Sequence, residues 1–101
     1  MKNVEFEKLE YLLKLERDVK KRQEYAKSMI KILKDIQLQF LSKAEERGYS
    51  LDSYNVLEIK LEQFKAMRQI AMEANISTNE FDKEIDLIMK TLWGENYKLI
   101  K

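Results

Sequence analysis

The feature that most constrains the fold is the stretch from residue 4 to residue 47, which contains neither glycine nor proline. Apolar residues recur within it at alternating spacings of three and four, the pattern of a helix with one apolar stripe. This stripe, called the seam, consists of Leu12, Leu15, Val19, Ala26, Met29, Leu33, Ile36 and Phe40, with Arg22 as its only charged member. The pattern predicts one helix over about residues 4–47, a rod of roughly 66 Å.

Few residues in the remainder of the chain are suited to end a helix, because proline is absent and only Gly48 and Gly94 occur. Gly48 suits the left-handed position that closes the first helix. Ser50 or Asp52 is suited to cap the start of a second helix, which is predicted over about residues 53–74. This second helix carries apolar residues on two sides, so we expect it to lie between two other helices.

The junction that follows the second helix has the clearest local signal. Ser77 and Glu80 have the spacing of a capping box, and Ile76 and Phe81 flank them at the spacing of a hydrophobic staple. Asn75 tolerates the left-handed conformation that a tight turn between helices requires. These residues therefore predict a sharp corner between the second and third helices.

The third helix is predicted over about residues 78–93, where Gly94 is placed to end it. The expected fold is all-α and forms a single domain over residues 1–101. In it, a long N-terminal helix packs with a two-helix hairpin as three coiled-coil-like helices. One alternative remains open, because residues 16–24 contain a single apolar residue, Val19. A break in that segment would give a four-helix bundle instead.

A continuous first helix predicts self-association. The second helix, at roughly 33 Å, covers only half of a 66 Å rod. The apolar residues of the uncovered half then need another partner, and a second copy of the chain is the simplest one; these residues are Phe6, Leu9, Leu12, Leu13 and Leu15. Arg22 is either a buried charge that sets the register of the dimer or, as we prefer, a seam-edge residue with its charged end in water.

Basic residues are concentrated in residues 14–34, which hold eight Lys and Arg against three acids. Such a helix can neutralise phosphates, so this stretch is a candidate nucleic-acid contact. It equally suits an acidic protein partner, and residues 73–86 of the same chain are acidic. The candidate contact residues within it are Lys20, Lys21, Arg22, Lys27 and Lys31.

The corner at residues 70–88 resembles a helix-turn-helix unit. The packing positions of that motif are matched by Ile70, Ala71, Asn75, Ile76, Ser77, Phe81, Ile85 and Ile88. The resemblance implies that the second helix of the pair would lie in a DNA major groove. Against this, Glu80, Asp82, Glu84 and Asp86 on that helix would repel phosphates, so we interpret the corner mainly as structural.

Equipment for catalysis is sparse. The chain has no histidine and no cysteine, which removes the commonest general base and the usual ligands of zinc. Its serine and threonine hydroxyls have no histidine to activate them. We therefore expect no enzyme activity, no catalytic or cofactor-binding residues, and no metal site.

Trp93 and Tyr97 form an aromatic end that is either a partner-binding patch or, as we prefer, the closure of the core. The charged N-terminus does not resemble a signal peptide and no apolar run reaches membrane-spanning length, so a cytoplasmic location is expected. The predicted function is that of a small non-enzymatic regulator, inhibitor or adaptor that forms a homodimer and binds a protein partner. The alternatives are a dimeric nucleic-acid-binding regulator and a structural subunit of a larger assembly.

Overall fold

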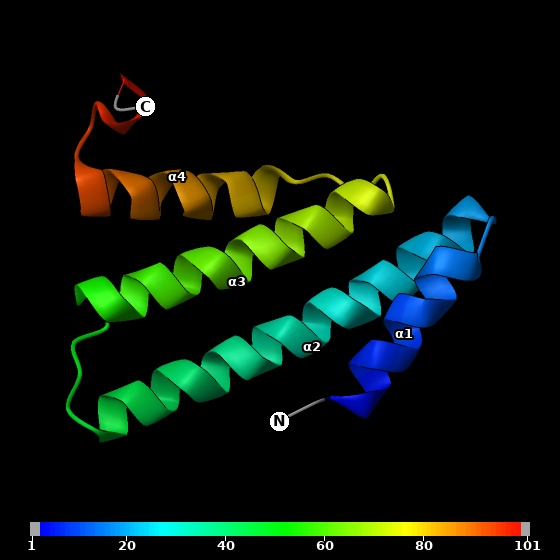
Figure 1. Cartoon of the computed structure of the whole chain (residues 1–101), viewed down its shortest axis with the longest axis horizontal. Helices are drawn as coiled ribbons and strands as arrows, with labels where there is room; N and C mark the ends of the chain where they lie inside the picture. The colour runs from blue at the N-terminus through cyan, green and yellow to red at the C-terminus, as the bar shows by residue number, and fades with distance from the viewer. Residues whose placement is uncertain (1–2, 100–101) are drawn as a thin grey trace.

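The computed structural model describes residues 3–99, and within them it confirms an all-α fold without strands (Figure 1). Four α-helices follow one another along the chain, and a short 3₁₀ helix, η1, comes after the last of them. Their bounds are α1 Val4–Leu15, α2 Val19–Glu46, α3 Tyr54–Glu73, α4 Asn79–Trp93 and η1 Tyr97–Leu99.

The continuous helix predicted over residues 4–47 is wrong, because the chain reverses between Leu15 and Val19. Four helices fit the alternative with a break near residues 16–24. In Figure 1, α1 folds back along the N-terminal half of α2 instead of extending it. The predicted rod is therefore divided, and α2 alone, with 28 residues, is about 42 Å long.

The reversal is stabilised by side chains that compete with the helix for backbone N–H groups. The carboxylate of Glu16 accepts hydrogen bonds from the N–H groups of Arg17 and Asp18, at 3.2 and 3.3 Å. Asp18 then caps α2, because its carboxylate accepts from the N–H of Lys20 at 3.1 Å. Aspartate is among the strongest N-cap residues, so a helix can start here although no glycine or proline ended the previous one.

The fold-back gives α1 a partner within its own chain. Leu13 is buried in the core, and Phe6 and Leu9 pack against it. The prediction that these residues require a second copy of the chain is therefore wrong. The C-terminal half of α2, by contrast, is not reached by α1 (Figure 1).

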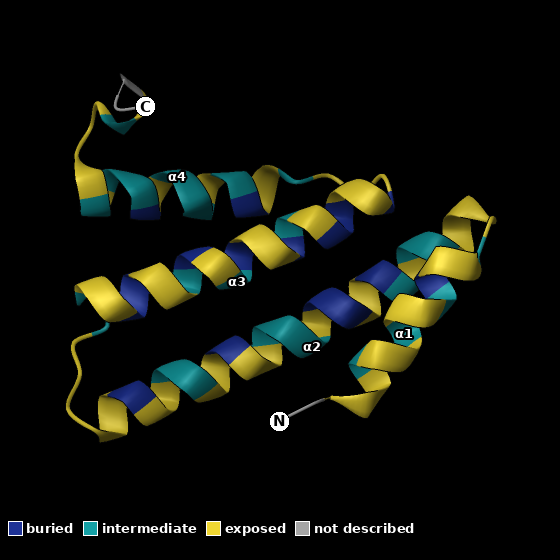
Figure 2. Cartoon of the chain, viewed as in Figure 1, coloured by how far each residue is buried: buried dark blue, intermediate teal, exposed yellow. Residues whose placement is uncertain are grey.

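The core lies where α3 packs between α2 and α4, as its two apolar sides predict. Figure 2 shows buried residues on the facing sides of these three helices. Met29 of α2 and Met67 of α3 are the largest side chains that are fully buried. From α3 and α4, the core includes Leu57, Leu61, Phe64, Ala71, Phe81 and Ile88.

Three residues with positive φ mark the ends of helices. Gly48, with φ of 82°, follows α2, and the N–H of Tyr49 donates to the carbonyl of Ala44 at 2.9 Å. Asn75, with φ of 58°, makes the corner between α3 and α4, and Gly94, with φ of 90°, follows α4. The left-handed conformation expected at Gly48 and Asn75 is thus present.

The predicted caps of α3 and α4 are different in the structure. Ser53, rather than Ser50 or Asp52, occupies the N-cap of α3, without a side-chain hydrogen bond. At α4 the N-cap is Thr78, and the hydroxyl of Ser77 accepts from the N–H of Asn79 at 3.3 Å. The capping box is therefore absent, since its expected acid, Glu80, forms an ion pair with Lys34 instead.

The molecule is flat and open for its length. Its extents are 41 × 35 × 18 Å and its radius of gyration is 15.3 Å, against about 13 Å for a compact domain of 100 residues. Its accessible surface is 7592 Å² at 12.2 kDa, whereas a compact monomer of that mass exposes roughly 6,100 Å². The chain therefore exposes roughly 1,500 Å² more than its mass requires.

A candidate protein-interaction site

An apolar groove runs between the C-terminal half of α2 and the N-terminal half of α3. The part of α2 that α1 covers is its other, N-terminal half (Figure 1). It consists of two hollows of about 300 and 340 Å³, which share Ile59 as a lining residue. Its floor is formed by Leu33, Phe40, Ala44, Val56, Ile59 and Ala66. We call this feature the α2–α3 groove.

The floor of the α2–α3 groove continues the seam beyond the reach of α1. Leu33 and Phe40 are half-buried, whereas Ile36 and Ile59 are 40% and 42% exposed. In the N-terminal half of the seam, Ala26 and Met29 are buried inside the chain and Leu12 is half-buried. Leu15 and Val19 are exposed at the reversal. The structure thus divides the predicted self-association seam into a core half and an uncovered half.

The two sides of the groove carry opposite charges. Lys43 and Arg47, from α2 and its C-cap, form a basic rim, and Glu58 and Glu62 of α3 form an acidic rim. Within residues 3–99 neither basic residue forms an ion pair, and Glu62 has only an exposed contact of 3.8 Å with Lys65. Such an exposed pair contributes little, so these charges remain available to a partner.

Tyr54 and Gln63 add two polar groups on the acidic side of the groove. Glu58 accepts a hydrogen bond from Tyr54, which together with the negative charge of that carboxylate raises the pKa of Tyr54. The side-chain oxygen Oε1 of Gln63 is buried beside the second hollow and accepts no hydrogen bond within residues 3–99. Gln63 therefore adds a buried polar group to the largely apolar lining of the second hollow.

Sequence reasoning missed most of this site. The rim residues and Ile59 were not among the predicted contacts. The available signal was the second apolar side of α3, which α4 does not cover. Its position opposite Leu33 and Phe40 of the seam could be inferred only once the break at residues 16–18 was known.

The guanidinium of Arg22 binds backbone carbonyls of its own chain, so the preferred interpretation of a charged end in water is wrong. Its guanidinium donates to the carbonyls of Leu13 at 2.6 Å and Glu16 at 2.9 Å, at the end of α1. It also donates to the carbonyl of Glu73 at 2.9 Å, at the end of α3. Carbonyls in the last turn have no partner within their own helix, so Arg22 ties two helix ends to α2.

The lysines of the basic stretch do not spread evenly around α2. The spacings of seven, four and three residues between Lys20, Lys27, Lys31 and Lys34 place them along one side of the helix. The last three line a hollow of about 300 Å³ between α2 and the start of α4. Lys34 is engaged there by Glu80 at 2.9 Å, whereas Lys20, Lys21, Lys27 and Lys31 are exposed.

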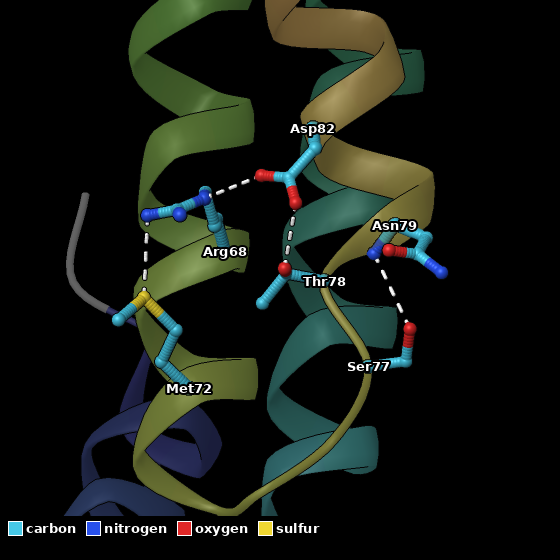
Figure 3. A network of polar contacts seen from close by, with 6 residues as sticks. All are labelled: Arg68, Met72, Ser77, Thr78, Asn79 and Asp82. Carbon is cyan, nitrogen blue, oxygen red and sulfur yellow. Dashed lines mark hydrogen bonds and ion pairs between the residues drawn. The ribbon is translucent and has the colours of Figure 1, made fainter.

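Asp82, an acidic residue of the α3–α4 corner, is held by donors of the same chain (Figure 3). Asp82 accepts from the hydroxyl of Thr78 at 2.7 Å and from Arg68 at 2.5 Å. These hydrogen bonds, the one from Thr78 first, lower the pKa of Asp82. The Arg68–Asp82 pair thus fastens α3 to α4 at the helix-turn-helix-like corner.

The aromatic end of the chain is arranged differently from the preferred expectation. Trp93 is 43% exposed and does not belong to the buried core. Tyr97 is half-buried and donates a hydrogen bond to Asp86, which also lies 3.1 Å from Lys90. The bond from Tyr97, followed by that from Lys90, lowers the pKa of Asp86. Trp93 therefore remains a candidate surface contact, whereas the hydroxyl of Tyr97 is engaged within the chain.

Two further observations bear on function. Within residues 3–99 no helix combines the length and the apolar character that crossing a bilayer requires. In the same residues no three metal-ligating side chains gather into a cluster.

No protein-family model matches the chain, and neither does any curated protein or solved structure with which it was compared.

Proposed function

We propose that this protein is a non-enzymatic helical interaction protein, a regulator, inhibitor or adaptor of the cytoplasm that associates with itself and binds a macromolecular partner. The observation that carries the proposal is the uncovered α2–α3 groove, an apolar surface with charged rims. Contiguous exposed apolar surface is typical of protein–protein contact sites. The absence of histidine and cysteine from the whole sequence makes catalysis the weaker interpretation.

The open shape of the chain supports the same proposal. A surface excess of roughly 1,500 Å² is larger than the area of about 800 Å² that each partner contributes to a standard protein interface. Residues such as Ile36 and Ile59 would gain about 25 cal/mol for each Å² of apolar surface that a partner removes from water. The chain thus exposes enough surface for a standard interface, and Ile59 places exposed apolar surface within the groove.

Substitution of Ile59 by aspartate tests the proposal. We expect the wild-type chain to sediment above its monomer mass at tens of micromolar, and the Ile59→Asp chain to sediment as a monomer. The side chain is already 42% exposed, so the helical circular dichroism should change little. The charge would be placed at the centre of the groove, where burial by a partner is costly.

Leu87→Asp is the matched control, because Leu87 is an apolar residue of α4 that is 61% exposed and does not line the groove. This variant should sediment like the wild type. Growth of the wild type far beyond a dimer would favour the structural-subunit alternative. Monomeric sedimentation of the wild type, together with unchanged capture of cellular partners by Ile59→Asp, would contradict the groove as the site.

A nucleic-acid-binding regulator is the second candidate, and the stripe of four lysines on α2 is the observation that favours it. Three of these lysines, Lys20, Lys27 and Lys31, are exposed on one side of the helix. Phosphates bound by such a stripe would release counterions, so binding should weaken steeply with salt.

This candidate predicts that duplex DNA binds at about 50 mM salt and is released well below 200 mM. The Lys27→Ala/Lys31→Ala chain should lose most of this binding, measured by fluorescence anisotropy of a labelled duplex. Lys8→Ala/Lys14→Ala, which removes the same charge from exposed positions of α1, is the control. A flat titration of the wild type at low salt would remove the candidate.

A further inference from the structure

We propose that the occupant of the α2–α3 groove is a second copy of this chain, related by a two-fold axis that runs along the groove. In this arrangement α2 of one copy lies against α3 of the other. Lys43 of each copy then faces Glu58 of the partner subunit. The inference rests on the self-association part of the proposed function and specifies its geometry.

The height of the rim residues along the helices supports this arrangement. Lys43 lines the same hollow as Asn55, Val56 and Ile59, so it lies opposite the turn of α3 that contains Glu58. A two-fold axis parallel to the helices keeps each residue at its height and exchanges the two helices. The basic rim of one copy is therefore placed against the acidic rim of the other, twice in each dimer.

Other occupants match the groove less well. A basic helix would be attracted by Glu58 and Glu62 but repelled by Lys43, and an acidic helix would meet the reverse. A copy of the chain carries both signs at the required spacing by construction. Electrostatic complementarity of this kind fixes the orientation of an interface, while burial of Phe40 and Ile59 supplies most of its affinity.

The exposed surface of the whole chain is compatible with a dimer. A stable interface takes about 800 Å² from each partner, and the chain exposes roughly 1,500 Å² more than a compact monomer of its mass. The remaining excess leaves surface such as the lysine stripe of α2 free for a different partner.

Charge reversal at the two rims tests the pairing. Lys43→Glu should face Glu58 of its own partner subunit, and Glu58→Lys should face Lys43, so each variant alone should dimerise at least ten-fold more weakly than the wild type. An equimolar mixture of the two variants should recover a wild-type dissociation constant as a heterodimer, because each contact again joins opposite charges. The doubly reversed chain, K43E/E58K, should recover as a homodimer.

Sedimentation equilibrium measures the dissociation constants, and native mass spectrometry of chains with different isotope labels identifies the heterodimer. Lys27→Glu and Glu45→Lys are the controls, since both lie on α2 outside the groove linings. Their mixture should show no gain over either chain alone.

Each outcome separates the two proposals. A wild-type dimer that Ile59→Asp disrupts, but whose charge-reversed variants neither weaken nor complement one another, would overturn this geometry and leave the groove as the site. A wild type that remains monomeric at 100 µM would overturn the two-fold pair, and groove-dependent binding of a different protein would then still support the proposed function.

Discussion

Replacing Arg22 with methionine should lower the free energy of unfolding by about 2–4 kcal/mol, because the substitution removes three hydrogen bonds from a charged donor. The bonds go to the carbonyls of Leu13, Glu16 and Glu73. The guanidinium also places a positive charge at the negative ends of two helix dipoles. Methionine retains the apolar stem, so the change isolates the polar head. Urea denaturation followed by circular dichroism measures the effect.

Arg17→Met is the matched control, since Arg17 is exposed at the reversal and its guanidinium forms no hydrogen bond within residues 3–99. It should change stability by less than about 0.5 kcal/mol. Hydrogen exchange adds a second measurement, because loss of Arg22 should release α1 before the rest of the chain. Equal stability of the two variants, with full protection of α1, would show that Arg22 does not hold these helix ends.

Truncating Met67 to alanine should cost about 2–5 kcal/mol, the range for removing a large buried side chain. Met67 of α3 is 0% exposed and belongs to the buried core cluster. Loss of its three outer heavy atoms leaves a cavity in the core that cannot collapse without movement of the packed helices. A lower urea midpoint with an unchanged m-value would report this loss of stability.

Met67→Leu is the control, because it keeps an apolar side chain of similar volume and should cost less than about 1.5 kcal/mol. The pair of variants separates packing from any property of the sulfur atom. If leucine destabilised the chain as much as alanine, the cost would lie in side-chain shape rather than in a cavity.

The helical character and the corners of this chain are readable from local sequence. Helix φ and ψ values depend on near neighbours, so the absence of proline and the placement of Gly48, Asn75 and Gly94 predict helices and their ends. The two apolar sides of α3 likewise predict that it lies between two helices. Each of these inferences requires only residues within a few turns of one another.

The reversal at residues 16–18 was harder to predict because its cause is a competition between similar energies. Glu16 and Asp18 are acceptable helix residues, yet their carboxylates also bind backbone N–H groups and cap a new helix. The choice depends on what α1 gains by packing Leu13 into the core and by receiving Arg22 at its end. Those contributions exist only in the folded chain.

The candidate site depends on the same long-range choice. The seam residues Ile36 and Phe40 are apolar whether the first helix is continuous or broken. Once α1 folds back, however, it covers only the N-terminal half of α2. The charged rims come from two helices and meet across a groove that no local pattern encodes. Lys43 and Glu58 therefore became candidates only when their positions in space were known.

By itself, the amino-acid sequence determined that this chain is helical and where three of its turns lie. Those properties follow from backbone preferences and from the periodicity of side chains, which act over short separations. Only the tertiary structure decided that α1 reverses, that Arg22 binds two helix ends, and that the uncovered surface is a groove with oppositely charged sides. These features depend on contacts between residues as distant as Arg22 and Glu73, whose energies arise when the helices pack.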